Sequence, residues 1–131
     1  MIQLKRAYEA AAKTDGSRFL VERLWPRGVR KENLPLKAWV KDAAPSTQLR
    51  QWFGHDPRKW PEFQRRYLAE LRHRRASLEP LLAAARSGAR VTLVYSSHDA
   101  EHNNAVVLKA YLESLLAADS RAPKAGLGQA S

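Results

Sequence analysis

The sequence predicts a small single-domain α/β protein with a short, mostly parallel sheet flanked by helices. Three observations indicate this class. The chain has 131 residues, which is enough for one ordinary domain. Its apolar patterns follow the order strand, strand, helices, strand, helix. The clearest strand pattern is almost wholly apolar and lies between helical patterns, as the interior strands of parallel sheets do.

Two strands are expected near the N-terminus. Residues 1–5 alternate apolar and polar side chains, which is the period of a short strand. The segment 18–25 (RFLVERLW) is rich in residues that favour strands, and it would place Arg23 on one face with Trp25. Pro26 cannot donate to a ladder, so regular pairing should stop there.

Helices are expected in the middle of the chain. Ser46 is a good N-cap for a short helix that starts at Thr47, and Gly54 would end this helix. Asp56 followed by Pro57 is a second helix start, and apolar residues follow it at helical spacing. Both helices would turn their apolar side chains inward.

The chain from Ser77 onward is predicted to hold a helix, a strand and a long helix. Ser77 would cap the first helix, and residues 90–95 (RVTLVY) would form the strand. An apolar stripe over residues 107–116 indicates the long helix. We therefore expect one α/β domain over residues 1–118. Residues 119–131 have little to bury, and we expect a disordered tail there.

Composition narrows the possible functions. The chain has no cysteine, which excludes disulfides, thiolate catalysis and cysteine-ligated zinc. No apolar run approaches the roughly 20 residues of a membrane span. The start, MIQLKRAYEA, lacks the apolar core of a signal peptide. We expect a cytoplasmic protein without a membrane partner.

Positive charge is concentrated in two parts of the chain. The net charge is +10, and 15 of the 23 cations are arginines. Residues 5–31 carry eight cations against three anions, and residues 58–90 carry nine against three. This bias indicates either a polyanion or an anionic ligand as the partner, or a well-solvated basic surface.

A polar pocket is predicted beyond the ends of the strands, where ligands gather in open α/β sheets. Tyr95 and Ser96 end the strongest strand, and the next helix would present free N–H groups to an anion. Asn103 would orient the ligand. Capping of the helix by Asp99 or Asn103 is the alternative, and the two roles can coexist.

The segment RLWPRG would supply the cations of this pocket. Arg23 and Arg27 would clamp an anionic group, because a guanidinium binds phosphate or carboxylate through two hydrogen bonds. The alternative for Arg23 is a structural ion pair with a carboxylate of this chain, either Asp42 or Glu22.

Four more residues are candidates for the same pocket. Gly28 would permit a close approach of the backbone, and Trp25 would either pack in the core or stack on a base. His98 and His102 are the candidates for a general acid or base. Their four-residue spacing also suits two metal ligands on a helix, but no third ligand is evident. We predict neither a metal nor another cofactor.

A competing hypothesis places the function on the arginine-rich region 58–75. Arginines and aromatic side chains together can follow a nucleic-acid backbone and stack on bases. The other interpretation is a basic solvent face, stabilised by Glu62 and Arg66 as an i,i+4 pair. The cations that would contact nucleic acid are Arg65, Arg66, Arg72, Arg74 and Arg75.

The motifs in their order resemble one known family. The stretches KRAYEAAAKTDGSRFLVERLWPRGVRK, APSTQLRQWFGHDPRKWPEFQRRYLAEL and VTLVYSSHDAEHNNAVVLKAYL are similar to the YeaO-like proteins, domain-of-unknown-function family 488. The resemblance covers residues 2–117 and implies a bacterial, cytosolic protein without an established reaction. Asn104 departs from the family's pattern, because relatives often have histidine there. The pattern marks Arg23, Trp25, Pro26, Arg27, Gly28, Pro45, Ser46, Tyr95, Ser96 and Asn103.

Together these features predict a site for a phosphate-bearing, nucleotide-like ligand. The partner would be a phosphorylated small molecule or a nucleic acid, and any chemistry would be hydrolysis or transfer on that ligand. The expected ligand-binding residues are Arg23, Trp25, Arg27, Gly28, Tyr95, Ser96 and Asn103.

Overall fold

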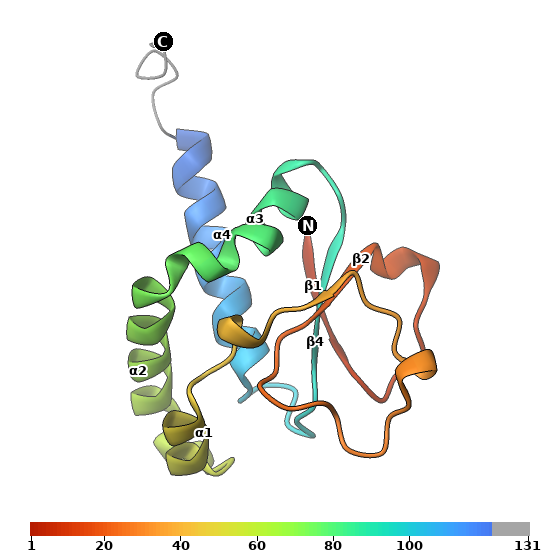
Figure 1. The fold of residues 1–131 in the computed structure, drawn as a ribbon. Helices are drawn as coiled ribbons and strands as arrows, with labels where there is room; N and C mark the ends of the chain where they lie inside the picture. The colour runs from red at the N-terminus through yellow and green to blue at the C-terminus, as the bar shows by residue number, and fades with distance from the viewer. Residues whose placement is uncertain (122–131) are drawn as a thin grey trace.

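A four-stranded parallel sheet forms one layer of the protein. The computed structural model describes residues 1–121 (Figure 1). The strand order is β1-β4-β2-β3, and all three neighbouring pairs are parallel. The prediction of a small α/β domain with a parallel sheet is therefore confirmed. The strands are β1 (Ile2–Arg6), β2 (Ser17–Leu20), β3 (Ala38–Trp39) and β4 (Val91–Tyr95).

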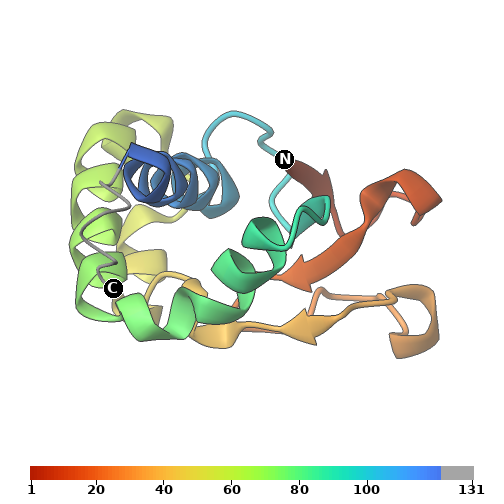
Figure 2. The same ribbon diagram turned by 90° about the horizontal axis from the view of Figure 1, so that it is seen from above.

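The helices gather on one side of the sheet (Figures 1 and 2). They are α1 (Thr47–Phe53), α2 (Trp60–His73), α3 (Glu79–Arg86) and α4 (Asn104–Arg121). Short 3₁₀ turns separate many of the elements. They are η1 (Lys13–Asp15), η2 (Lys31–Asn33), η3 (Lys41–Ala43), η4 (Pro57–Lys59) and η5 (Arg75–Leu78). No helix in the described part of the chain combines the length and the hydropathy that a membrane span needs.

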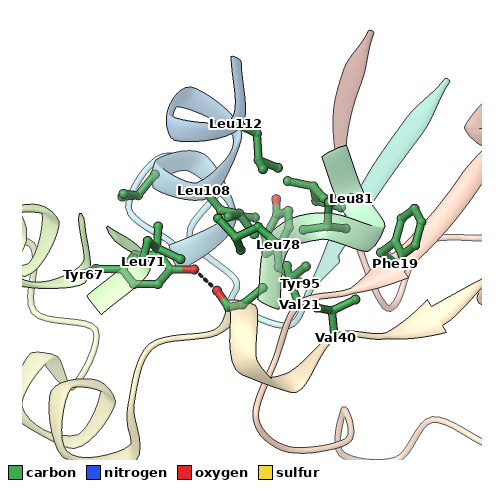
Figure 3. Close-up of a cluster of buried hydrophobic side chains, with 14 of the residues drawn as sticks. Phe19, Val21, Val40, Tyr67, Leu71, Leu78, Leu81, Tyr95, Leu108 and Leu112 are labelled. Atoms are coloured by element: carbon green, nitrogen blue, oxygen red, sulfur yellow. Dashed lines mark hydrogen bonds between the residues drawn. The ribbon is translucent and has the colours of Figure 1, made fainter. Parts of the chain in front are cut away.

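The main core fills the space between the sheet and the helices (Figure 3). Phe19 and Tyr95 come from the strands, and Tyr67 comes from α2. The Tyr67 hydroxyl donates to the carbonyl oxygen of Ala43, so its polar end is satisfied although the ring is fully buried (Figure 3). A smaller apolar cluster covers the other face of the sheet, where loop residues pack on Leu20, Val94 and Leu34.

Capping residues fix the helix boundaries. The Ser46 hydroxyl accepts the N–H of Leu49, and α1 ends at Gly54 in a left-handed conformation, as predicted. The prediction of Ser77 as an N-cap is wrong. η5 runs directly into α3, and Leu78 precedes α3 without a side-chain cap. α4 extends through Arg121, and the rest of the predicted tail lies outside the described residues.

The second strand is shorter than predicted, and its pairing with β4 ends one residue before β4 does. β2 stops at Leu20, although the Val21 N–H still donates to the carbonyl oxygen of Val94. Arg23 and Trp25 therefore do not share a strand face, and that expectation is corrected.

A buried ion cluster supports the start of β2. The Asp15 carboxylate accepts hydrogen bonds from Lys5 Nζ at 3.0 Å, Arg18 Nη1 at 2.6 Å and the Ala12 N–H at 2.9 Å. Burial alone would raise the pKa of Asp15, but these donors outweigh it and lower the pKa to about 2. Gly16 follows at φ +67°, where a Cβ atom would lie 2.2 Å from the carbonyl oxygen of Arg90.

Candidate ligand-binding site

A cavity of about 540 Å³ opens beyond the C-terminal ends of β2 and β4. This is the edge at which open α/β sheets bind ligands, and the sequence predicted a pocket there. Aromatic and proline side chains form much of its wall, and the polar groups come from several separate segments. The residues that the following argument uses are Glu22, Trp25, Arg27, Arg50, Phe53 and Phe63.

A carboxylate of the chain itself faces the end of β4. Oε2 of Glu22 accepts a hydrogen bond from the backbone N–H of Ser96 at 3.0 Å. Ser96 was predicted to donate to a ligand anion, but its N–H already has an acceptor within the protein. Burial raises the pKa of Glu22 to about 7, although the Ser96 N–H and the charge of Arg50 oppose the shift. The cavity thus contains a carboxyl group that is partly protonated near neutral pH.

Arg50, which lies in α1 and lines the cavity, was not among the predicted site residues. Its Nε is buried without a hydrogen-bond partner, and its guanidinium makes no hydrogen bond to any described residue. A buried donor without an acceptor is costly, because it has lost its hydrogen bonds to water and has gained none from the protein. Arg50 is therefore the cation of the cavity that is best placed for an incoming anion. Only its helical position among apolar neighbours could have marked it in the sequence.

Arg23 lies outside the wall of the cavity and makes internal contacts. Its Nη1 is 3.1 Å from Oδ1 of Asp42, and its Nε donates to the carbonyl oxygen of Pro45 at 3.2 Å. The geometry thus agrees with the structural alternative, in which the anion opposite Arg23 belongs to the protein. The contacts join the segment after β2 to the start of α1.

The turn after Arg23 contributes two of the predicted residues to the cavity. Trp25 lines it, donates from Nε1 to the carbonyl oxygen of Val29 at 2.6 Å and packs edge-on against Trp39. Arg27 lines it with an exposed side chain. Gly28 has φ +77°, but no atom lies within 4 Å of the position its Cβ would take. Glycine at this position therefore permits the positive φ of the turn, and no other part of the protein approaches it closely.

Residues 95–104 agree with the prediction in part, because Ser96 and Asn103 line the cavity, whereas Tyr95 is not in its wall. Tyr95 is buried in the main core, where burial raises the pKa of its hydroxyl. Asn103 is the cap of α4, because its Oδ1 accepts the N–H of Val106 and its Nδ2 donates to the carbonyl oxygen of Asp99. Asn104 is also buried, and its Nδ2 donates to the carbonyl oxygen of Val21 at 2.7 Å.

Both candidate histidines line the cavity, but they precede α4 and do not share a helical face. Nη2 of Arg6 lies 3.1 Å from Nδ1 of His98, and Nδ1 of His102 lies 2.9 Å from Oδ2 of Asp99. The backbone N–H groups of Glu101 and His102 lower the pKa of Asp99. Within residues 1–121, no group of three or more metal-ligating side chains could hold an ion.

The arginine-rich region carries much of its charge in internal pairs. Arg65 and Arg66 both bind Glu62, whose pKa falls to about 2 as a result. Arg74 binds Glu70 and backbone carbonyls, whereas Arg72 and Arg75 are exposed. Aromatic rings in or near the region are also engaged in contacts within the protein. Tyr67 is buried in the core, and Lys59 and Arg66 cover Trp52.

The comparisons with known proteins agree on one family. A family model described as the inactive DUF488-N3 subclade matches residues 1–127. The uncharacterised protein YeaO of Escherichia coli K12 is 41% identical over 114 residues, which cover 87% of this chain and 98% of that protein. The uncharacterised protein Rv3073c of Mycobacterium tuberculosis H37Rv is 38% identical over 107 residues, or 82% and 89%. No solved structure gave a significant match.

Proposed function

We propose that this chain, which belongs to the YeaO-like DUF488 family, binds a phosphate-bearing, nucleotide-like ligand in the cavity beyond β2 and β4. Arg50 and Arg27 would bind the anionic group. Trp25, Phe53 and Phe63 would contact the apolar part of the ligand. A cavity of about 540 Å³ lies within the range of roughly 300–1,000 Å³ that holds small-molecule ligands.

The observation that carries this proposal is the unsatisfied Nε of the Arg50 guanidinium. Its Nε is buried beside the cavity and has no acceptor. A phosphate oxygen at this place would accept from a donor that is already desolvated, so binding gains a charge-assisted hydrogen bond at a small additional cost. A guanidinium also offers two parallel donors, which suit the geometry of a phosphate.

We propose binding without turnover as the role of the site. Asn104 stands where the resemblance implies that relatives often carry histidine, and its amide is buried and bonded to the backbone of Val21. Nδ1 of His102 is engaged by Asp99. The description of the matching subclade as inactive supports the same view.

Calorimetric titration with ribose 5-phosphate and adenosine and guanosine 5′-monophosphates tests the proposal. The wild type should bind at least one of them, and Arg50→Ala should weaken that binding at least tenfold. Arg23→Ala is the matched control, because Arg23 lies outside the cavity wall, and its affinity should stay within twofold of wild type. Absence of binding to the wild type, or an equal loss in both variants, would overturn the proposal.

A further inference from the structure

Glu22 presents an acceptor to the cavity that no described residue uses. Its Oε2 is fixed by the Ser96 N–H, whereas Oε1 makes no hydrogen bond to any described residue. The other carboxylate in the wall, Asp99, binds the N–H groups of Glu101 and His102 and the imidazole of His102. Glu22 is thus the acidic group in the wall with an oxygen left for a ligand.

A fixed carboxylate beside an apolar wall selects for donors on the ligand. Two parallel N–H donors match the two oxygens of a carboxylate, as in arginine–carboxylate pairs. Among the common nucleobases, guanine presents such an edge, formed by N1–H and the 2-amino group. Adenine presents an acceptor at N1 beside its amino group, so its N1 would oppose a carboxylate oxygen.

We propose that Glu22 makes the cavity selective for a guanine base. The inference rests on the proposed function and names the ligand class for that site. The base would lie against Trp25 and Phe53, with its donor edge toward Glu22 and its phosphate toward Arg50 and Arg27. Each oxygen of Glu22 has two lone pairs, so Oε2 can keep the Ser96 N–H while it accepts from the base.

The size of the preference for guanine over adenine follows from the hydrogen-bonding groups that adenine leaves without a partner. A site built for a hydrogen bond strongly rejects an analogue that lacks the group, because its buried acceptor is then left unpaired. Guanosine monophosphate should therefore bind at least tenfold tighter than adenosine monophosphate. Inosine monophosphate keeps N1–H but lacks the 2-amino group, so its affinity should lie between the two.

The preference should also depend on pH. Burial raises the pKa of Glu22 to about 7, and the groups around it are Ser96, Arg50 of α1 and Tyr67 of α2. The ionised carboxylate only accepts hydrogen bonds, which matches the two donors of guanine. The neutral carboxyl also donates a hydrogen bond, so it can pair with the N1 acceptor of adenine. The guanine-to-adenine affinity ratio should therefore rise from pH 6 to pH 8. Comparison with Glu22→Gln isolates the contribution of Glu22 to this ratio.

The test is a calorimetric titration of ribose 5-phosphate and guanosine, inosine and adenosine monophosphates at pH 6 and pH 8. Wild type should show the guanine preference at pH 8, and in Glu22→Gln the guanine-to-adenine ratio should fall to about one. Circular dichroism checks the fold of the variant, and the pH dependence of the wild type provides a readout that needs no variant. Equal affinities for all three nucleotides would overturn the guanine inference and leave the proposed site intact. Failure of ribose 5-phosphate and every nucleotide to bind would overturn both.

Discussion

The backbone N–H of Ser96 donates to Oε2 of Glu22 at 3.0 Å. This contact joins the end of β4 to the segment after β2, and it places a carboxylate where the sequence suggested a ligand anion. The partner of Arg23 likewise belongs to the protein, because Asp42 lies 3.1 Å away. In the wall of the cavity, Arg50 has a buried Nε without an acceptor, and for this reason we propose it as a cation that binds the ligand.

Arg23 and Arg50 should differ in their effects on stability. Arg23→Ala removes the contacts to Asp42 and to the carbonyl oxygen of Pro45, and it should lower the free energy of unfolding by about 1–2 kcal/mol. Arg50→Ala removes an unsatisfied donor, and because Glu22 can take up a proton when the charge of Arg50 is lost, it should cost less than about 0.5 kcal/mol. Urea denaturation at pH 7 measures both changes. A larger loss in Arg50→Ala than in Arg23→Ala would contradict this assignment.

Glu22→Gln should stabilise the protein more as the pH rises. The folded pKa of Glu22 is about 7 against a usual value of 4.5, so the folded state holds the extra proton between these values. This proton uptake by Glu22 therefore stabilises the folded state fully below pH 4.5, and the stabilisation is lost as the pH rises through 7. The amide of glutamine has no such dependence. The stability of the variant relative to wild type should grow by about 2 kcal/mol from pH 5 to pH 8 in urea titrations. A constant difference would show that Glu22 titrates normally.

Asp15→Asn should be strongly destabilising. Lys5 and Arg18 both lose their carboxylate partner, and Arg18 is 6% exposed, so a buried charge is left unpaired. We expect a loss of about 3–5 kcal/mol at pH 7. In the wild type this stabilisation persists in mild acid and is lost only as the pH falls from 3.8 through about 2.

Asp42→Asn provides the matched control for Asp15, because Asp42 is 64% exposed and its pair should contribute less than about 1 kcal/mol. Chemical denaturation of the two variants side by side gives the comparison. Equal losses would mean that the buried cluster around Asp15 contributes no more than a surface ion pair.

Gly16 and Gly28 both have a positive φ, +67° and +77°, but different surroundings. A Cβ at Gly16 would lie 2.2 Å from the carbonyl oxygen of Arg90, whereas a Cβ at Gly28 would meet nothing within 4 Å. Gly28→Ala should therefore cost about 1 kcal/mol for its positive φ alone. Gly16→Ala adds a backbone clash and should cost at least about 3 kcal/mol. Thermal unfolding of the pair distinguishes the two terms, and similar melting temperatures would rule out the clash.

Local patterns were sufficient to predict most of the fold. The cap at Ser46 and the stop at Gly54 place α1 to the residue, because a helix end needs a side-chain acceptor and a left-handed residue. The apolar run over 90–95 identified β4 as an interior strand. β3 was not predicted, because a two-residue strand has no measurable period.

The site was harder to predict, because its contacts join distant segments. The strand-end rule located the cavity, and the turn at Trp25 and Arg27 reaches it. Glu22 binds the N–H of Ser96, which lies 74 residues later in the chain, and Arg50 acts on Glu22 from another element. No local sequence pattern encodes either relationship. Tyr95 was predicted as a ligand-binding residue but lies in the main core, because a strand that is apolar on both faces does not show which residues turn toward the helices.

The position of a bound phosphate tests the central claim most directly. A crystal structure of the chain grown with guanosine 5′-monophosphate should show the phosphate within hydrogen-bond distance of the Arg50 guanidinium and the base beside Glu22. A phosphate bound instead to Arg23, or to Arg65 and Arg66 on α2, would contradict the account, as would a cavity without nucleotide at saturating concentration.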